Sequence, residues 1–315
     1  MKHLQSILRR NGDDEFLERA LQGTSRTFAL AIPLLSEERR REVGLTYLLF
    51  RVADSIEDAV DVTADRKIRL LSVFRDMLCV ESGGASEETP VVPDAANSFA
   101  GMWPCGSAVE ELMCSVPRLV AVYQGLPAPV TAIIRRSLFR TIDGMTVFLG
   151  GSEPSERQIC LETVADLRLY CYSVAGIVGE LLTDLFVLHH ASAEPMHGEL
   201  RRLAVGFGEF LQLINILKDS DDDAKQGRSF IPAGVSRADV FEIAQQSHAE
   251  SVRYLHLLDQ QRFPADVFAF CEFIFLLAEG SMSVLRSMGA GRKLSRDDVQ
   301  RILLKVRTSA ERRTA

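Results

Sequence analysis

Charged residues interrupt an otherwise apolar segment near the N-terminal third of the chain. Arg51, Asp54 and Asp58 follow Tyr47 at steps of four, three and four residues, among Leu, Phe, Val, Ala and Ile. Residues three or four positions apart share a face of an α-helix, so these side chains form one polar stripe, with Glu57 at its edge. A helix that is apolar on its other faces is expected to be buried, so the stripe is predicted to face an internal cavity.

A second apolar segment repeats this pattern later in the chain. Gln212, Asn215 and Asp219 fall on one helical face, together with Asp222 or Asp223. Like charges at i,i+4 cost a helix about 0.2–0.5 kcal/mol, and buried carboxylates cost more unless cations compensate them. A solvated face with local ion pairs would explain one such segment, whereas two segments favour a cation held between them.

Carboxylate clusters of this kind suit Mg²⁺, a hard cation that keeps much of its water shell and is commonly completed by phosphate oxygens. The sequence therefore predicts Mg²⁺ that bridges the protein to a di- or triphosphate. Arg51, Lys218 and Arg228 could neutralise the rest of that anion. A di-iron bundle is the competing interpretation, but it needs paired Glu-x-x-His motifs, and the chain has one, from Glu194 to His197.

Small residues line one side of a third segment, where Ser173, Gly176 and Gly179 are spaced by three. A glycine inside a helix costs about 1 kcal/mol relative to alanine, so the strip needs an explanation. Close helix packing is the simpler one, and room for a long apolar substrate is the alternative. Tyr170 and Tyr172 offer hydroxyls and ring faces beside it, and an aromatic face stabilises a cation by about 0.5–2 kcal/mol.

The sequence carries no P-loop, Rossmann fingerprint or kinase signature for phosphate chemistry. An apolar cavity with magnesium-binding carboxylates instead suits ionisation of an allylic diphosphate. The metal stabilises the leaving group, and the apolar wall keeps water from the carbocation.

Helices are the elements that must position these residues. The 315-residue chain is 47% hydrophobic and 25% charged, and its prevalence of Leu, Ala, Arg and Glu over Thr and Tyr favours an all-α fold. Hydrophobic periodicity supports this, and no alternating strand pattern is found. The predicted helices span about residues 13–32, 37–62, 64–80, 107–124, 128–149, 155–187, 197–224, 237–261, 264–287 and 295–310.

One segment of low hydrophobicity, residues 81–106, is rich in Gly, Ser and Pro. The two acidic segments lie on opposite sides of it and need one another. We therefore expect a surface loop within one domain that spans residues 1–315, rather than a linker between two domains.

The composition also excludes several classes of protein. A net charge of −7 argues against a nucleic-acid binder, which would need a broad basic surface. Six cysteines without CxxC spacing are expected to be reduced core residues. The N-terminus lacks the pattern of a secretion signal, so a cytoplasmic location is expected. The longest apolar run, Val267–Ala278, is too short to span a bilayer and is expected to form a buried core helix.

The C-terminal segment, residues 292–315, differs in charge from the rest of the chain. It has eight Arg or Lys residues against three acidic ones, a local net charge of +5. Each basic group near an anionic surface contributes about 1 kcal/mol, so weak peripheral contact with the inner face of the membrane is expected. A solvated helix is the alternative.

Four segments resemble the squalene and phytoene synthase family of head-to-head prenyl synthases, and the resemblance covers about residues 13–290. They are TSRTF (24–28), YLLFRVADSIED (47–58), LYCYSVAGIVGE (169–180) and QLINILKDSDDDAKQGRSFIP (212–232), in the family's order. This resemblance implies an isoprenoid-synthase helical bundle in a single domain around a central cavity.

The resemblance also implies roles for individual residues. The residues expected to hold Mg²⁺ bound to diphosphate are Asp54, Asp58, Asp219 and Asp223, with Glu57 and Asp222 at the family's other acidic positions. The residues expected to contact or position diphosphate are Ser25, Arg51, Gln212, Asn215 and Arg228. Lys218 is added to this set because of its positive charge. Tyr170 would stand near the reacting carbons and Phe28 would line the entrance. Tyr47 and Arg51 complete the expected catalytic set.

The implied activity is that of a farnesyltransferase that joins two farnesyl diphosphates through presqualene diphosphate. The first acidic segment is most like squalene synthases, and the overall resemblance is to a bacterial squalene synthase that uses NADPH. The residues from Tyr170 to Glu180 instead resemble bacterial carotenoid enzymes, so phytoene, dehydrosqualene or hydroxysqualene synthesis without reduction stays open. The family also includes a non-enzymatic helical assembly factor, which degenerate acidic motifs would favour. Both motifs are intact here.

Overall fold

The computed structural model describes residues 2–59, 62–79, 103, 106–150 and 159–314, with side chains from residue 12 onward. The expected all-α fold is confirmed, because the described residues form helices and their one β-type contact is an isolated bridge between Cys160 and Ser229. The chain divides into two compact units, residues 1–142 and 143–315, at a point inside helix α8. The single domain stays a prediction, and most of the expected 81–106 loop lies outside the described residues.

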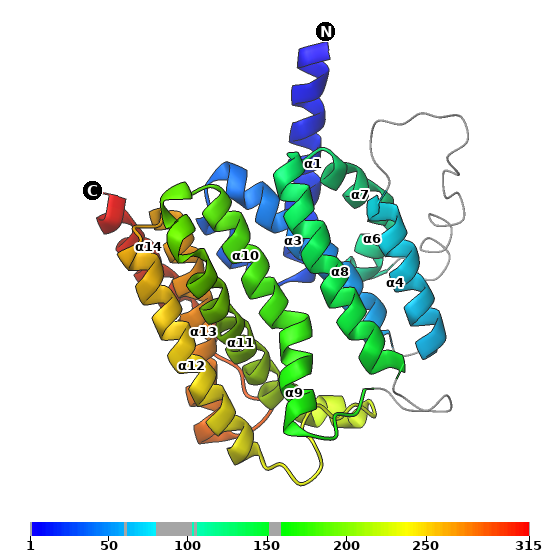
Figure 1. Ribbon diagram of the computed structural model, residues 1–315, viewed down its shortest axis with the longest axis vertical. Helices are drawn as coiled ribbons and strands as arrows, with labels where there is room; N and C mark the ends of the chain where they lie inside the picture. Colours follow the sequence, from blue (N-terminus) through cyan, green and yellow to red (C-terminus); the bar gives the residue numbers. More distant parts are fainter. Residues whose placement is uncertain (1, 60–61, 80–102, 104–105, 151–158, 315) are drawn as a thin grey trace. The chain divides into compact units, whose positions relative to one another are not determined.

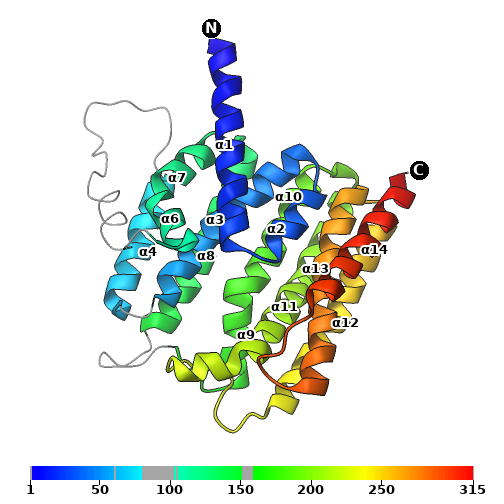
Figure 2. The same cartoon turned by 180° about the vertical axis from the view of Figure 1, so that it is seen from behind.

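The first unit is built around α3, which contacts α1, α4, α6 and α7. These helices surround α3 in both views (Figures 1 and 2). Glu37 and Glu38 in the first turn of α3 complement the positive end of the helix dipole. The elements are α1 (Lys2–Thr24), α2 (Phe28–Ala31), the 3₁₀ turn η1 (Ile32–Leu34), α3 (Glu37–Asp58), α4 (Ala64–Cys79), α6 (Ala108–Cys114), α7 (Val116–Gln124) and α8 (Ala128–Gly150) as far as residue 142.

The helix predicted over residues 13–32 is interrupted after Thr24. The hydroxyl of Ser25 accepts a hydrogen bond from the backbone N–H of Phe28 at 2.8 Å. A hydroxyl in this position satisfies an N–H that the new helix α2 cannot pair internally. The TSRTF segment is therefore a turn between two helices.

The second unit is built around α11, which contacts α10, α12, α13 and the π-helical turn η2. Capping boxes at Thr163 and Ser236 fix the starts of α9 and α12. The elements are α9 (Val164–Cys171), η2 (Tyr172–Gly176), α10 (Ile177–Leu188), the 3₁₀ turn η3 (Ala191–Met196), α11 (His197–Lys225), α12 (Arg237–Gln260), α13 (Ala265–Met288) and α14 (Arg296–Thr314).

Glycines let α10 and the π-turn pack closely against α11. A Cβ atom on Gly179 would lie 2.2 Å from the carbonyl oxygen of Ala204, and one on Gly208 would lie 2.3 Å from that of Ala175. Both separations are far below van der Waals contact. This supports close packing as the explanation of the small-residue strip.

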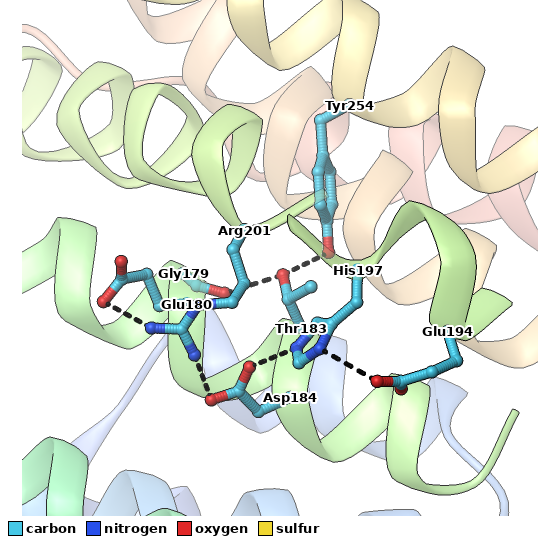
Figure 3. A network of polar contacts seen from close by, with 8 residues as sticks. All are labelled: Gly179, Glu180, Thr183, Asp184, Glu194, His197, Arg201 and Tyr254. Carbon is cyan, nitrogen blue, oxygen red and sulfur yellow. Dashed lines mark hydrogen bonds and ion pairs between the residues drawn. The ribbon is translucent and has the colours of Figure 1, made fainter. Parts of the chain in front are cut away.

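A polar network that the sequence did not predict joins α10 to α11 (Figure 3). The carboxylate of Asp184 is buried; it accepts from Arg201 and lies 2.7 Å from Nε2 of His197. Arg201 also pairs with Glu180 at 3.2 Å, and the exposed Glu194 lies 3.8 Å from His197. Nearby, the hydroxyls of Thr183 and Tyr254 share a hydrogen bond of 3.0 Å between α10 and α12.

Among the described residues, two helical stretches are long and apolar enough, by length and composition only, to cross a membrane. They are residues 164–188 and 265–288, in which 56% and 61% of the most apolar window is buried within the fold. Such burial is typical of core helices, as predicted for Val267–Ala278. Cys171 and Cys271 are buried, as expected of core residues, whereas Cys79 and Cys160 are exposed, so for these two the expectation of a core position was wrong.

Candidate functional site

The first acidic cluster, Asp54 and Asp58, lies on the last turns of α3. Burial, together with the negative charge of Asp58, raises the pKa of Asp54 to about 7, although Arg51 opposes this rise. Burial and a neighbouring negative charge both disfavour the ionised form of this carboxyl group, and a nearby cation would favour it. The cluster is therefore prepared for an additional cation.

Three further expected site residues gather on the N-terminal side of this cluster. The rings of Phe28 and Tyr47 have centroids 4.9 Å apart, and the hydroxyl of Tyr47 donates to the Thr24 carbonyl at 3.3 Å and is hydrogen-bonded to Ser25. Burial raises the pKa of Tyr47, so it stays a neutral donor near neutral pH. Tyr47 thus links the turn after α1 to the polar stripe of α3.

Arg51, on the same stripe of α3, has a side-chain hydrogen-bond donor that is available to a ligand. Its Nε atom is buried and has no hydrogen-bond partner among the described residues. A buried guanidinium donor without a partner is costly, and an anionic ligand would satisfy it. This observation agrees with a role for Arg51 in binding diphosphate.

The neighbouring acids of α3 differ in their surroundings. Asp58 is exposed, whereas Glu57 is 7% exposed. The backbone carbonyl of Glu57 accepts a hydrogen bond of 2.6 Å from Nζ of Lys67, a buried lysine on α4. Sequence reasoning did not include Lys67 in the site.

The second acidic cluster, Asp219, Asp222 and Asp223, lies at the end of α11, and each carboxylate has a basic neighbour. The nearest atoms of Lys218 and Asp219 are 3.3 Å apart, those of Lys225 and Asp222 are 2.7 Å apart, and those of Arg228 and Asp223 are 2.7 Å apart. Lys218 also donates to the side-chain oxygen of Asn215 at 2.8 Å, and Gln212 is half-buried one turn earlier. The expected polar face of α11 is thus present.

Asp222 and Asp223, which helical spacing alone left equivalent, differ in their surroundings. The side chain of Asp222 is 69% exposed and its partner Lys225 is 74% exposed, whereas that of Asp223 is 12% exposed. The hydrogen bond and charge of Lys225 lower the pKa of Asp222. Asp223 is therefore the better placed of the two for a buried metal, and its role stays a prediction.

An aromatic cluster surrounds Tyr170, which is 5% exposed. Its ring centroid lies 4.9 Å from that of Phe230 and 5.4 Å from that of Phe148, the latter edge-on. The guanidinium carbon of Arg228 is 5.8 Å from the centroid of Phe230. The cluster offers ring faces to a cation, next to a residue that pairs with the second acidic cluster.

The loop between α13 and α14 approaches the same end of α11. The backbone N–H of Gly291 donates to the Lys218 carbonyl at 2.9 Å, and the charge of Lys293 contributes to the lowered pKa of Asp222. Positive φ angles at Gly289 and Gly291 shape this loop. Its contact with α11 could not be foreseen from the sequence, because about 70 residues separate them.

The donor set fits Mg²⁺, although no three His, Cys, Asp or Glu side chains of the described residues lie close enough to hold a metal by themselves. Hard carboxylate oxygens are present on both helices, and a nearby cation would favour the ionised form of Asp54. Mg²⁺ commonly takes one or two carboxylates and completes its shell with water and phosphate oxygens. Carboxylate clusters that each have an arginine nearby match that habit.

Comparison with known proteins agrees with this chemistry. Squalene synthase ERG9 of Candida albicans is 32% identical over 209 residues, which cover 66% of this chain and 43% of that protein. The chain thus spans less than half the length of these curated relatives, among them squalene synthase ERG9 of Saccharomyces cerevisiae. A solved structure of TcSQS with the ligand BPH1237 has a TM-score of 0.69 at 23% identity and covers 95% of this chain and 90% of that one.

A dehydrosqualene synthase in complex with a ligand has a TM-score of 0.62 at 18% identity, over 96% of this chain and 98% of that one. Because both solved structures are less than 25% identical to this chain, the comparison with them shows a shared fold. A sequence model described as squalene/phytoene synthase matches residues 21–262, which include both acidic clusters, Arg51, Tyr170 and Arg228. The chain belongs to the squalene/phytoene synthase family.

Proposed function

We propose that this chain is a farnesyltransferase that joins two molecules of farnesyl diphosphate into presqualene diphosphate and converts this, with NADPH, into squalene. One observation carries the proposal: both acidic helices of the family are intact, and each has an arginine, Arg51 or Arg228, in reach of its carboxylates. The relatives named squalene synthase support the choice of product.

Asp54 and Asp58 of α3 and Asp219 and Asp223 of α11 would hold Mg²⁺, which would supply positive charge to stabilise the departing diphosphate. The open Nε donor of Arg51 would bind the diphosphate directly. Arg228 is already paired with Asp223, so it would be oriented before substrate arrives. Preorganised donors of this kind lower the barrier because they need not reorganise as charge develops.

The residues around Tyr170 would protect and stabilise the carbocation that remains. The faces of Tyr170 and Phe230 can stabilise a cation by about 0.5–2 kcal/mol, and these buried rings exclude water that would quench it. NADPH would supply the hydride that ends the reaction. No described residue is assigned to that cofactor, and its use rests on the relatives.

A substrate comparison tests the proposal. With Mg²⁺ and NADPH, the purified chain should convert farnesyl diphosphate into a C30 hydrocarbon and use geranylgeranyl diphosphate much less efficiently. A C40 product would favour phytoene synthesis. Absence of diphosphate release from either substrate would favour the non-enzymatic alternative.

Peripheral contact with an anionic membrane through α14 is a second proposal. Leu303 and Val306 are buried, whereas Leu304 is 68% exposed between basic side chains. The guanidinium of Arg313 lies 3.6 Å from the ring centroid of Phe268 on α13 and pairs with Asp259. Deleting the segment would therefore uncover α13, so charge reversal is the cleaner test.

Reversal of two exposed charges, Arg307→Glu with Arg312→Glu, lowers the net charge of residues 292–315 from +5 to +1. We expect at least about tenfold weaker flotation with vesicles that contain phosphatidylserine. The control reverses Arg69 and Arg135, which are also exposed but lie in the first unit. Equal binding by both double variants would show that α14 is only a solvated helix.

A further inference from the structure

The charges in the last turn of α3 are unfavourable for a helix end. The final carbonyls of a helix have no partner within it, and acidic side chains there oppose the negative end of the helix dipole. The turn carries Asp54, Glu57 and Asp58 and no basic residue. Its C-cap residue, Ala59, has φ −58° and ψ 118°.

Lys67 on α4 provides the missing cation. It is 5% exposed, although lysine is almost never buried unless it is paired. Its Nζ atom donates to the Glu57 carbonyl at 2.6 Å. A positive charge on a C-terminal carbonyl stabilises a helix end most strongly when the contact is buried.

The position of Lys67 on α4 explains how the lysine becomes buried. The buried residues of this helix are Lys67, Leu70, Leu71, Phe74 and Leu78, which share one helical face. The lysine thus occupies a position that the core would otherwise fill with an apolar side chain. By contrast, the acidic end of α11 has Lys225 in its own last turn and Arg228 shortly after it.

We propose that Lys67 is a positioning residue for the first acidic cluster. Its buried ammonium holds the last turn of α3 so that Asp54 and Asp58 keep the geometry needed to bind Mg²⁺ and diphosphate. Without it, the Glu57 carbonyl would lose its buried cationic donor, and the like charges of Asp54 and Asp58 at i,i+4 would further loosen the turn. The inference rests on the proposed function, since it takes both carboxylates to be metal ligands.

The test compares Lys67→Met, which keeps most of the volume but not the charge, with Lys67→Arg and with Arg69→Met. Arg69 lies on the same helix and is exposed, so its variant removes a charge without touching α3. The readouts are the affinity for Mn²⁺ with inorganic diphosphate, amide hydrogen exchange of residues 55–58, and Tm.

We expect Lys67→Met to bind Mn²⁺ and diphosphate roughly 10- to 100-fold more weakly, as for other residues that orient metal ligands. Exchange should accelerate in the last turn of α3 and stay unchanged in its first turns. Lys67→Arg should recover most of the affinity, and Arg69→Met should match the wild type. If Lys67→Met does not fold, Lys67→Gln carries the same test.

A purely structural lysine would lower Tm but leave the affinity unchanged at temperatures where the variant is folded, and that result would overturn the proposal. Unchanged exchange at residues 55–58 would overturn it as well. If the proposed function is wrong, the wild type itself will release no diphosphate from farnesyl diphosphate. The hydrogen-exchange comparison would still show whether Lys67 stabilises the last turn of α3.

Discussion

Asp54→Asn should reduce Mg²⁺-dependent diphosphate release by at least about 100-fold, the scale on which loss of one preorganised charge-stabilising group acts. Asparagine keeps the shape of the side chain but loses the charge that attracts a metal. The double variant Asp54→Ala, Asp219→Ala should lose release altogether. The control, Asp76→Asn, changes an exposed acid on α4 and should keep wild-type activity.

The same variant should make the metal-free protein more stable, in a manner that depends on pH. Asp54 has a pKa of about 7 in the folded protein and about 3.8 when unfolded, so the folded state binds more protons between these values. The free energy of unfolding of the wild type therefore falls as pH rises through this window. Asparagine does not titrate, so its advantage should be small near pH 4 and, for a shift of about three pKa units, reach about 4 kcal/mol at pH 8.

Thermal unfolding in EDTA at pH 4, 6 and 8 measures this advantage. A constant difference in Tm across the three pH values would contradict the raised pKa of Asp54. Full activity of the variant at saturating Mg²⁺ would contradict its role as a ligand. The two results are independent, so the electrostatics and the metal assignment can fail separately.

Asp184→Ala should cost about 3 kcal/mol of unfolding free energy, because it removes the shared acceptor of Arg201 and His197 from a buried position. The guanidinium of Arg201 would keep only Glu180, at 3.2 Å. Since the network joins α10 to α11 (Figure 3), the loss should appear as a lower midpoint of urea denaturation.

The matched control is Glu194→Ala in the same network. The side chain of Glu194 is 70% exposed and 3.8 Å from His197, so its removal should change the unfolding free energy by less than about 1 kcal/mol. Equal losses for the two variants would mean that burial does not set the strength of this network. A loss below about 1 kcal/mol for Asp184→Ala would mean that the network contributes little.

Much of the architecture could be predicted from the sequence. The helices expected at 37–62 and 197–224 lie within a few residues of α3 and α11, because long amphipathic periods are strong local signals. The break at Ser25 and the π-turn at Tyr172–Gly176 were not predicted. Both depend on hydrogen bonds that hydrophobic periodicity does not report.

The candidate site was predictable in part for a similar reason. Helical spacing grouped Asp54 with Asp58, but it left Asp222 and Asp223 equivalent, and only the surroundings of α11 bury one and expose the other. Lys67 and Asp184 were not predicted, although each is a charged residue on the apolar face of a helix, which is an unusual pattern in the sequence. The partner that justifies such a charge lies on another helix, which a sequence pattern does not identify.

The most direct test of the proposed function is to identify the product that the purified chain forms from farnesyl diphosphate and Mg²⁺, with and without NADPH. We predict squalene with NADPH, and accumulation of presqualene diphosphate or a marked fall in rate without it. A conjugated triene or hydroxysqualene, formed at the same rate whether or not NADPH is present, would contradict the reductive step while leaving the condensation intact. No C30 product under either condition would contradict the central claim that this chain joins two farnesyl groups.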